Sequence, residues 1–311
     1  MKFVTYDGGK TGLIKGDGVV DISSHCTGSG QAAMESLISN YESLKGDLEK
    51  LAKDGDATPL SSLKLDAPLP RPGKILAMGG NFLENGAKKP APMWGFTKSL
   101  DAVLAPGGTV VLPDIDANIF HHEAELVLVF GKNGENIKSA EAMDYVFGYT
   151  CGLDVSARIF TDTPAPARVP NTLPISSAKS YNGFAPMGPC IVTKDEITNP
   201  QNLHVELRVD GELRGDYNTN DMGNTIEESI EYVSAIESVS PGVVFYLGTN
   251  HQGLGAMQDG DNIEITIEQV GSFSFNVSDP LKRKWAKGVD QETAKAVREG
   301  TSGPGRSVRP L

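Results

Sequence analysis

The sequence has few cysteines and no long hydrophobic run. Its three cysteines, Cys26, Cys151 and Cys190, lie far apart with no CxxC spacing, which argues against a disulfide framework and favours reduced thiols in the core. A membrane-spanning helix needs about 18 or more consecutive apolar residues, and no such run occurs. The first residues, MKFVTYDGGKTG, contain no apolar signal segment. These absences predict a cytoplasmic protein with no membrane partner.

Basic residues are also fewer than acidic residues. The chain has 28 lysines and arginines against 40 aspartates and glutamates, which gives a formal net charge of −12. Nucleic acids and anionic membranes attract basic surfaces, so this balance argues against both as main partners. The excess of acidic residues indicates a hydrated surface.

The length of 311 residues allows a small domain followed by a larger one. Residues 1–66 are predicted to form a small N-terminal domain, because short strands with Gly and Asp turns precede one clear helical pattern. That pattern consists of Met34, Leu37, Ile38, Tyr41, Leu44 and Leu48. A catalytic domain is predicted over residues 67–280, and it begins with the Pro-rich connector APLPRPGK. Residues 281–311 are expected to be a partly disordered C-terminal extension.

The larger domain is predicted to be rich in β-structure. Short apolar strands are separated by Gly, Pro, Asn and Asp, and VELRVDGELRG alternates around Asp210-Gly211 as a β-hairpin does. One late helix is predicted in TIEESIEYVSAIESV. The strands do not alternate regularly with helices, which argues against a doubly wound parallel sheet and predicts a mixed, β-rich α+β fold.

Two carboxylates stand at the start of the most apolar predicted strand. Glu123 and Glu125 in HHEAELVLVF are two residues apart, so they share one face of a strand with Cα atoms about 7 Å apart. A single Glu-x-Glu is more often a hydrated strand end than a site. A third acid, Asp154, lies between Leu153 and Val155, where an unpaired carboxylate would be costly. Three carboxylates offer the hard oxygen ligands that suit Mg²⁺, Mn²⁺ or Ca²⁺, with water or substrate completing the coordination.

At this point the sequence resembles the fumarylacetoacetate hydrolase superfamily, in its branch of acylpyruvases and hydroxyheptadienedioate isomerases. The resemblance extends from about Lys74 to Val277 and is weaker in the first 65 residues. The segments that carry it are HHEAELVLVFGK, AMDYVFGYTCGLDVSAR, AKSYNGFAPMGPCIV, VDGELRGDYNTNDM and LGTNHQGLGAMQDGDNIEITIEQVG.

The resemblance implies a β-roll catalytic domain of the fumarylacetoacetate hydrolase type behind a small N-terminal α/β domain, and a homodimer. It implies that Glu123, Glu125 and Asp154 bind Mg²⁺ or Mn²⁺, and that the substrate is a small 2-oxo acid or diketo acid. Two oxygens of such a substrate can chelate the metal, which polarises the carbonyl and stabilises the enolate's negative charge.

Further site residues follow from the same resemblance. Lys179 matches an active-site lysine that pairs with a substrate oxygen, and Thr249 matches a threonine that contacts substrate. Asn81 and Tyr181 are also predicted to contact substrate. Arg158 could clamp an anion or form a structural ion pair, and the sequence favours neither.

The sequence departs from the family pattern in a lid segment over residues 79–94. Hydrolytic and decarboxylating members carry a His–Glu pair there, but this chain has Asn85 and Lys88 at those positions. An amide cannot act as a general base, so that part of the mechanism does not carry over. We expect the lid to be mobile without substrate and to close over it.

A replacement base is therefore needed, and His251 is the main candidate. His25 and His204 lie away from the predicted site, while His121 and His122 belong to the family pattern as supporting residues. His251 follows Thr249 on a Gly-flanked loop, and imidazole exchanges protons near neutral pH. A loop histidine without a catalytic role is the alternative, in which case Glu84 or a metal-bound hydroxide would be the base.

These observations predict a metal-dependent catabolic hydrolase that cleaves a C–C bond of an acylpyruvate-like 1,3-diketo acid through a metal-stabilised enolate. The alternative is a lyase or isomerase of a 2-oxo acid (a decarboxylase, hydratase, dehydratase or keto–enol isomerase), because the lid His–Glu pair is absent.

Overall fold

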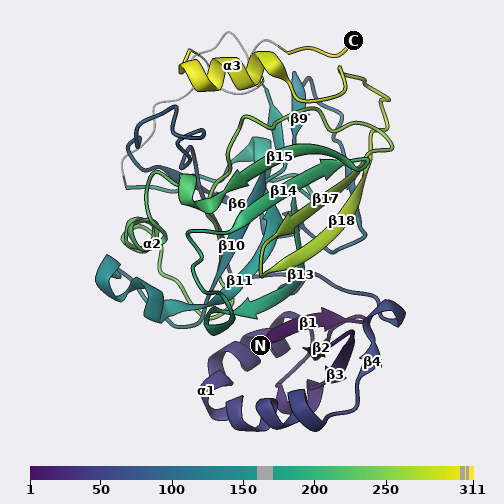
Figure 1. Ribbon diagram of the computed structural model, residues 1–311, viewed down its shortest axis with the longest axis vertical. Coiled ribbons are helices and arrows are strands. Elements are labelled where there is room, and N and C mark those ends of the chain that lie inside the picture. Colours follow the sequence, from purple (N-terminus) through teal and green to yellow (C-terminus); the bar gives the residue numbers. More distant parts are fainter. Residues whose placement is uncertain (160–170, 302–304, 306–307) are drawn as a thin grey trace.

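The N-terminal segment folds as a small sheet covered by one long helix. The structure is a computed structural model that describes residues 1–159, 171–301, 305 and 308–311. Helix α1 (Gln31–Asp54) buries most of the predicted stripe, with Met34 and Leu37 fully inaccessible, and Gly55 follows its last residue. Figure 1 shows this unit, drawn in purple, at one end of the molecule. Its strands are β1 (Lys2–Tyr6), β2 (Lys10–Lys15), β3 (Gly18–Asp21) and β4 (Thr58–Pro59).

The N-terminal strands continue the main sheet of the larger part. Strand β1 pairs with β13 through Lys2↔Val192 and Phe3↔Ile191, which gives the order β4-β3-β2-β1-β13-β11-β10-β16-β5-β6, with β7 beside β13. The predicted domain boundary at residue 66 therefore stays a prediction. The remaining strands of this sheet are β5 (Ile75–Met78), β6 (Gly95–Lys98), β7 (Val103–Leu104), β10 (Ala124–Phe130), β11 (Val146–Leu153), β13 (Ala185–Thr193) and β16 (Val244–Tyr246).

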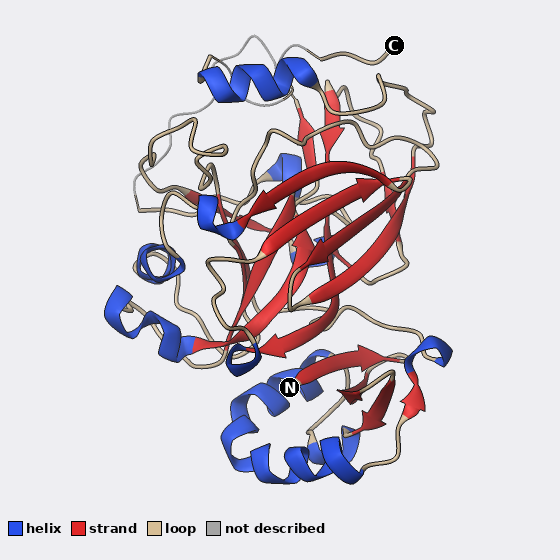
Figure 2. Ribbon diagram, in the orientation of Figure 1, coloured by secondary structure: helices blue, strands red, loops and turns tan. Residues whose placement is uncertain are grey.

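The central strands β10 and β11 are buried along their whole length. Because both faces of these strands are covered, their sequences are continuous apolar runs and do not alternate. Figure 2 shows that strands dominate the larger part of the molecule, and helices lie at its periphery. The predicted mixed, β-rich α+β fold is confirmed.

A second sheet has the order β15-β14-β17-β18-β8, and β9 pairs with β12 separately. The predicted hairpin joins β14 to β15, and Asp210 and Gly211 adopt the positive φ values, 52° and 81°, that its turn requires. These strands are β8 (Thr109–Val111), β9 (Ile119–His121), β12 (Ser156–Arg158), β14 (His204–Val209), β15 (Glu212–Asn218), β17 (Asn262–Ile267) and β18 (Gly271–Ser278).

The larger part contains a short helix, α2, that follows the β14–β15 hairpin. Helix α2 (Ile226–Ser234) begins with a capping box between Thr225 and Glu228, but it ends earlier than its apolar stripe predicts. Val239 instead forms a bridge with Gly134, so the last part of the stripe is buried by an extended segment. No helix in the described ranges is both long and apolar enough to cross a bilayer.

The C-terminal extension contains helix α3 (Gln291–Glu299), which lies at the end of the molecule opposite the N-terminal unit (Figure 1). The predicted partial disorder of residues 281–311 stays a prediction, because residues 302–304 and 306–307 lie outside those described.

Candidate metal centre and active site

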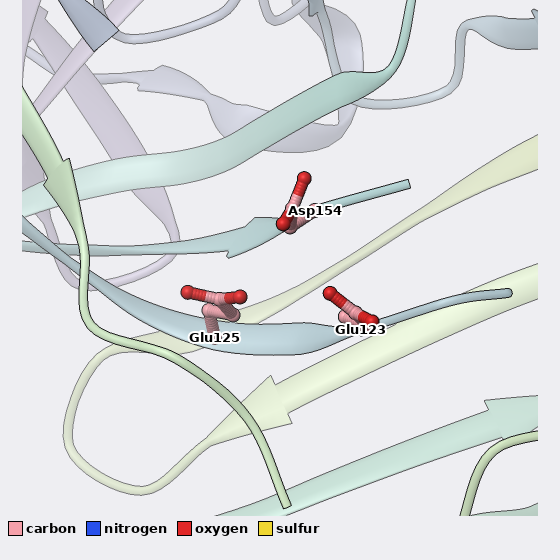
Figure 3. Close-up of side chains that lie close together, drawn as sticks. All are labelled: Glu123, Glu125 and Asp154. Atoms are coloured by element: carbon pink, nitrogen blue, oxygen red, sulfur yellow. The ribbon is translucent and has the colours of Figure 1, made fainter. Parts of the chain in front are cut away.

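The three predicted carboxylates meet at the ends of two neighbouring strands. Strands β10 and β11 are antiparallel with Ala124 opposite Leu153, so Glu123 and Asp154 lie next to each other, and the Asp154 N–H donates to the Glu123 carbonyl at 2.8 Å. Glu123 and Glu125 project from one strand toward the strand end that carries Asp154 (Figure 3). One oxygen of each carboxylate lies within 4.8 Å of the others, and all three residues are buried.

Basic side chains surround two of these carboxylates. Lys179 Nζ donates to Glu123 Oε2 at 2.7 Å and also to Asp154. Arg158 pairs with Glu123. Lys98 is fully buried on β6, where it pairs with Asp154 and donates to the Phe184 carbonyl at 2.7 Å. The structure therefore gives Arg158 the ion pair that the sequence left as one of two options.

The charges affect the carboxylates in opposite ways. Burial alone would raise the pKa of Glu123, but Lys179 and Arg158 outweigh burial and hold that pKa well below its usual range. Burial, together with the neighbouring Asp154 and Glu123, raises the pKa of Glu125 well above its usual range. No ion pair to Glu125 is found among the described residues, and its carboxylate accepts one N–H, from Gly248 at 2.6 Å.

This donor set fits a divalent cation. Three buried carboxylates facing one another repel unless positive charge lies between them, and Glu125 has no basic side chain bonded to it in the described part of the chain. All-oxygen donors select hard cations such as Mg²⁺ or Mn²⁺. Glu123, Glu125 and Asp154 are the residues that would hold such an ion.

The two histidines before the carboxylates do not join this group. His121 Nδ1 faces Arg158 Nε at 3.2 Å, and burial, helped by Arg158, lowers the pKa of His121 well below its usual range. Burial lowers the pKa of His122 to about 4. Both pKa values favour neutral imidazoles, and the supporting role of these histidines stays a prediction.

A histidine–glutamate pair lies beside the carboxylates, built from positions that the lid pattern does not use. Glu84 Oε1 lies 2.7 Å from His251 Nδ1, and Glu84 Oε2 accepts the His251 backbone N–H at 2.9 Å. The opposite ring nitrogen, Nε2, lies 3.9 Å from Glu123 Oε1. The two sequence candidates for the base thus form one unit, and one end of that unit faces the candidate metal centre.

The turn that carries Glu84 is held in an unusual backbone conformation. Glu84 and Asn85 have φ values of 58° and 60°, which non-glycine residues rarely adopt. Asp221 accepts the N–H groups of Asn85 at 2.8 Å and Gly86 at 3.0 Å, and it also accepts from Asn250 Nδ2 at 3.0 Å. Asp221 therefore ties the lid turn to the loop that carries His251.

The remaining predicted substrate residues are placed differently. Thr249 is buried with its hydroxyl 3.2 Å from that of Tyr217, whose hydroxyl also donates to the Ala124 carbonyl between the two glutamates. Asn81 Nδ2 donates to the Leu247 carbonyl at 3.1 Å, and Asn81 Oδ1 accepts the Asn224 N–H at 3.1 Å. Asn81 therefore holds the start of the lid in place. Tyr181 packs on Phe184 and lines a surface depression whose described lining does not include Lys179. Tyr217 thus links Thr249 to the backbone between the two glutamates, and the substrate contact of Tyr181 stays a prediction.

Sequence reasoning missed two polar residues of this region, Lys98 and Asp221. Lys98 follows Phe96 by two residues in the strand GFTK, so its side chain shares a face with an aromatic core residue. A lysine in that position was a detectable signal for a buried charge partner. Asp221 gave no such signal, because its three partners come from distant loops.

The comparison with known families agrees with this geometry. The family described as Fumarylacetoacetate (FAA) hydrolase C-terminal matches residues 74–278, about two thirds of the chain. The chain belongs to the fumarylacetoacetate hydrolase family. That range contains every predicted site residue.

Several relatives in this family are known enzymes. A maleylpyruvate hydrolase from Sphingobium sp. SYK-6, solved with manganese(II) and pyruvate, has a TM-score of 0.77 at 31% identity, covering 90% of this chain and 99% of that one. A maleylpyruvate hydrolase from Aquipseudomonas alcaligenes is 28% identical over 300 residues, 89% of this chain and 99% of that protein. A mitochondrial oxaloacetate tautomerase from Xenopus laevis is 33% identical over 225 residues, 69% of this chain and 68% of that protein.

Proposed function

We propose that this chain is a divalent-metal-dependent hydrolase that cleaves a C–C bond of an acylpyruvate-like 1,3-diketo acid. The observation that carries the proposal is the His251–Glu84 pair, with His251 Nε2 facing Glu123 of the carboxylate triad. A base beside a candidate metal centre is what water activation at a carbonyl requires. The Sphingobium relative with manganese and pyruvate supports the metal and the 2-oxo acid product.

The metal, Mg²⁺ or Mn²⁺, would be held by Glu123, Glu125 and Asp154, and when bound it would act as a Lewis acid toward the oxygens of the 2-oxo acid. Lys179 and Arg158 bring positive charge to the same place, since both contact Glu123. Burial disfavours the charge on Lys179, but Asp154 and Glu123 outweigh burial and raise the pKa of Lys179 above its usual range. Lys179 therefore stays cationic and can pair with a substrate oxygen.

The histidine–glutamate pair handles the protons in this proposal. Glu84 accepts from Nδ1, which fixes the tautomer and leaves Nε2 free to take a proton from water. The water oxygen adds to the acyl carbonyl carbon, and the bond from that carbon to the methylene group breaks. The electron pair moves to the methylene carbon, His251 returns the proton there, and the products are a carboxylic acid and pyruvate.

The second candidate function is tautomerisation or another lyase or isomerase reaction of a 2-oxo acid. The 33% identity to an oxaloacetate tautomerase favours it, because moving a proton between carbon and oxygen needs the same base but no water addition. The two candidates differ in their products. A panel of acylpyruvates, oxaloacetate and 2-oxo-3-deoxy sugar acids, followed by mass spectrometry, separates them. A pair of smaller acids indicates hydrolysis, and loss of carbon dioxide or gain or loss of water indicates a lyase. An unchanged mass indicates a tautomerase only if the protein also speeds up the approach to the keto–enol equilibrium.

We also propose a homodimer formed through the larger domain and a cytoplasmic location. The family resemblance supports the dimer, and a monomer at micromolar concentration in analytical ultracentrifugation would contradict it. The Xenopus relative is described as mitochondrial, so fractionation of cells that express the natural protein is the measurement that decides its location.

A further inference from the structure

A mostly apolar pocket adjoins the candidate metal centre. Its volume is about 440 Å³, within the usual range for small-molecule sites. The described residues that form it include Met93, Trp94, Phe96, Pro174, Tyr232 and Lys179. Lys179 also contacts Glu123 and Asp154, so one side chain belongs both to this pocket and to the carboxylate cluster. A ligand bound at the carboxylates therefore has room to extend into the pocket.

The aromatic wall of the pocket is closely packed. The rings of Trp94 and Phe96 are 6.0 Å apart, and the Lys179 ammonium lies 5.0 Å from the centre of the Phe96 ring. A Cβ atom at Gly79 would lie 2.1 Å from the Trp94 ring, so the indole rests directly on the backbone at the start of the lid. Glycine at this position is what allows the tryptophan to form part of the wall.

The described lining of the pocket carries little charge. Among the described lining residues, Lys179 is the one basic side chain, and its ammonium is already shared by Glu123 and Asp154. Aspartate and glutamate are absent from the same described lining. Among the described lining residues, a carboxylate placed beside Met93, Trp94 and Tyr232 would lose its hydration and would find no cation other than Lys179.

We propose that this pocket holds the acyl group of the substrate and selects an uncharged, apolar acyl group over one that ends in a carboxylate. This inference rests on the proposed function, because it takes the 2-oxo acid end of the substrate to lie at the carboxylate triad. It narrows the substrate class to acylpyruvates with alkyl or aryl side chains. Each methylene added to the acyl chain raises kcat/KM by about fourfold until the pocket is filled.

The test uses two acylpyruvates of equal size, one ending in an isopropyl group and one ending in a carboxylate. Pyruvate release by the Mn²⁺-loaded full chain gives kcat/KM, and we expect the isopropyl compound to be favoured by about tenfold or more. Equal or better turnover of the carboxylate compound overturns the inference while leaving the hydrolase proposal standing. Calorimetric binding of the same pair tests the pocket separately. If neither compound releases pyruvate, the proposed function fails, and the pocket inference then stands or falls on which compound binds more tightly.

A matched pair of variants tests the position of the pocket. Tyr232→Arg places a cation in the described lining, and we expect it to shift the preference toward the carboxylate compound by about tenfold. Ala235→Arg adds the same charge at the exposed end of α2, outside the pocket, and leaves the preference unchanged. Equal shifts in both variants would show a general charge effect and would contradict the assignment. Thermal unfolding of both variants checks that each is folded, and the wild-type comparison does not depend on either.

Discussion

At the scale of single residues, the pair of His251 and Glu84 carries the functional argument. His251→Ala removes the proton acceptor, so we expect turnover of an acylpyruvate to fall about 10²-fold or more while Mn²⁺ affinity is retained. Steady-state kinetics measures the turnover, and titration with Mn²⁺ measures the affinity. The control is His204→Ala, because His204 is exposed on β14 and pairs with Asp216 away from the site. Unchanged turnover in His251→Ala would leave His251 as a loop residue.

Glu84 acts through His251, so its removal has a distinct signature. Glu84→Gln keeps the shape of the side chain but loses the negative charge that fixes the Nδ1 proton. We expect about a tenfold loss of kcat with little change in KM, and nearly the same rate in the double variant as in His251→Ala. Additive losses in the double variant, measured by steady-state kinetics, would show that the two residues do not act as one unit.

The carboxylate triad predicts the metal dependence directly. Glu125→Gln keeps the size of the side chain but removes a charged ligand, so we expect Mn²⁺ binding and activity to be lost together. Equilibrium dialysis with Mn²⁺ and an activity assay after chelation and re-addition measure both. Glu264, exposed on β17, provides a matched control as Glu264→Gln. If Glu125→Gln binds Mn²⁺ as tightly as the wild type does, Glu125 is not a metal ligand.

At the scale of elements, the lid turn depends on Asp221. Asp221→Ala removes the acceptor of the Asn85 and Gly86 N–H groups, so the strained turn is expected to open and move Glu84 away from His251. We expect faster hydrogen exchange over residues 79–94 and about a tenfold lower turnover, with Mn²⁺ affinity unchanged. Hydrogen exchange of the lid identical to that of the wild type would show that Asp221 does not hold the turn.

The strand that carries the carboxylates could be predicted from the sequence better than the loops around it. The carboxylate triad was predictable, because strand periodicity places Glu123 and Glu125 on one face and an aspartate in an apolar run needs a partner. The pairing of Glu84 with His251 was not, because it depends on two loops that approach across 167 residues of sequence.

At the scale of the whole molecule, Asp279 and Arg283 connect the C-terminal extension to the β-sheet part of the molecule. Arg283 donates to Asp279 and to the carbonyls of Pro113 and Ile115, and it lies 4.9 Å from the centre of the Phe120 ring. Burial alone would raise the pKa of Asp279, but hydrogen bonds from Arg283 and backbone N–H groups outweigh it and lower that pKa. The carboxylate therefore stabilises the fold above the pKa it has in the unfolded chain.

This sign gives a stability prediction. Asp279→Asn is expected to lower the free energy of unfolding by about 2 kcal/mol at neutral pH. The difference between wild type and variant should shrink as the pH falls below about 4, because the unfolded chain takes up the proton first, and it should be lost once the pH passes below the lowered pKa of Asp279 in the folded protein. Urea unfolding across this range measures it. A difference that is constant with pH would show that the charge of Asp279 is not the source of the stabilisation.

Addition of water across a C–C bond distinguishes the proposed hydrolase from a tautomerase, and a labelling experiment measures it. The Mn²⁺-loaded protein is supplied with an acylpyruvate that carries an apolar acyl group, in water enriched in heavy oxygen. A hydrolase will give equal amounts of pyruvate and a carboxylic acid, with one solvent oxygen in the new carboxylate. Recovery of the diketo acid with its carbon skeleton intact and only its keto–enol ratio changed would rule out the hydrolase and identify the chain as a tautomerase.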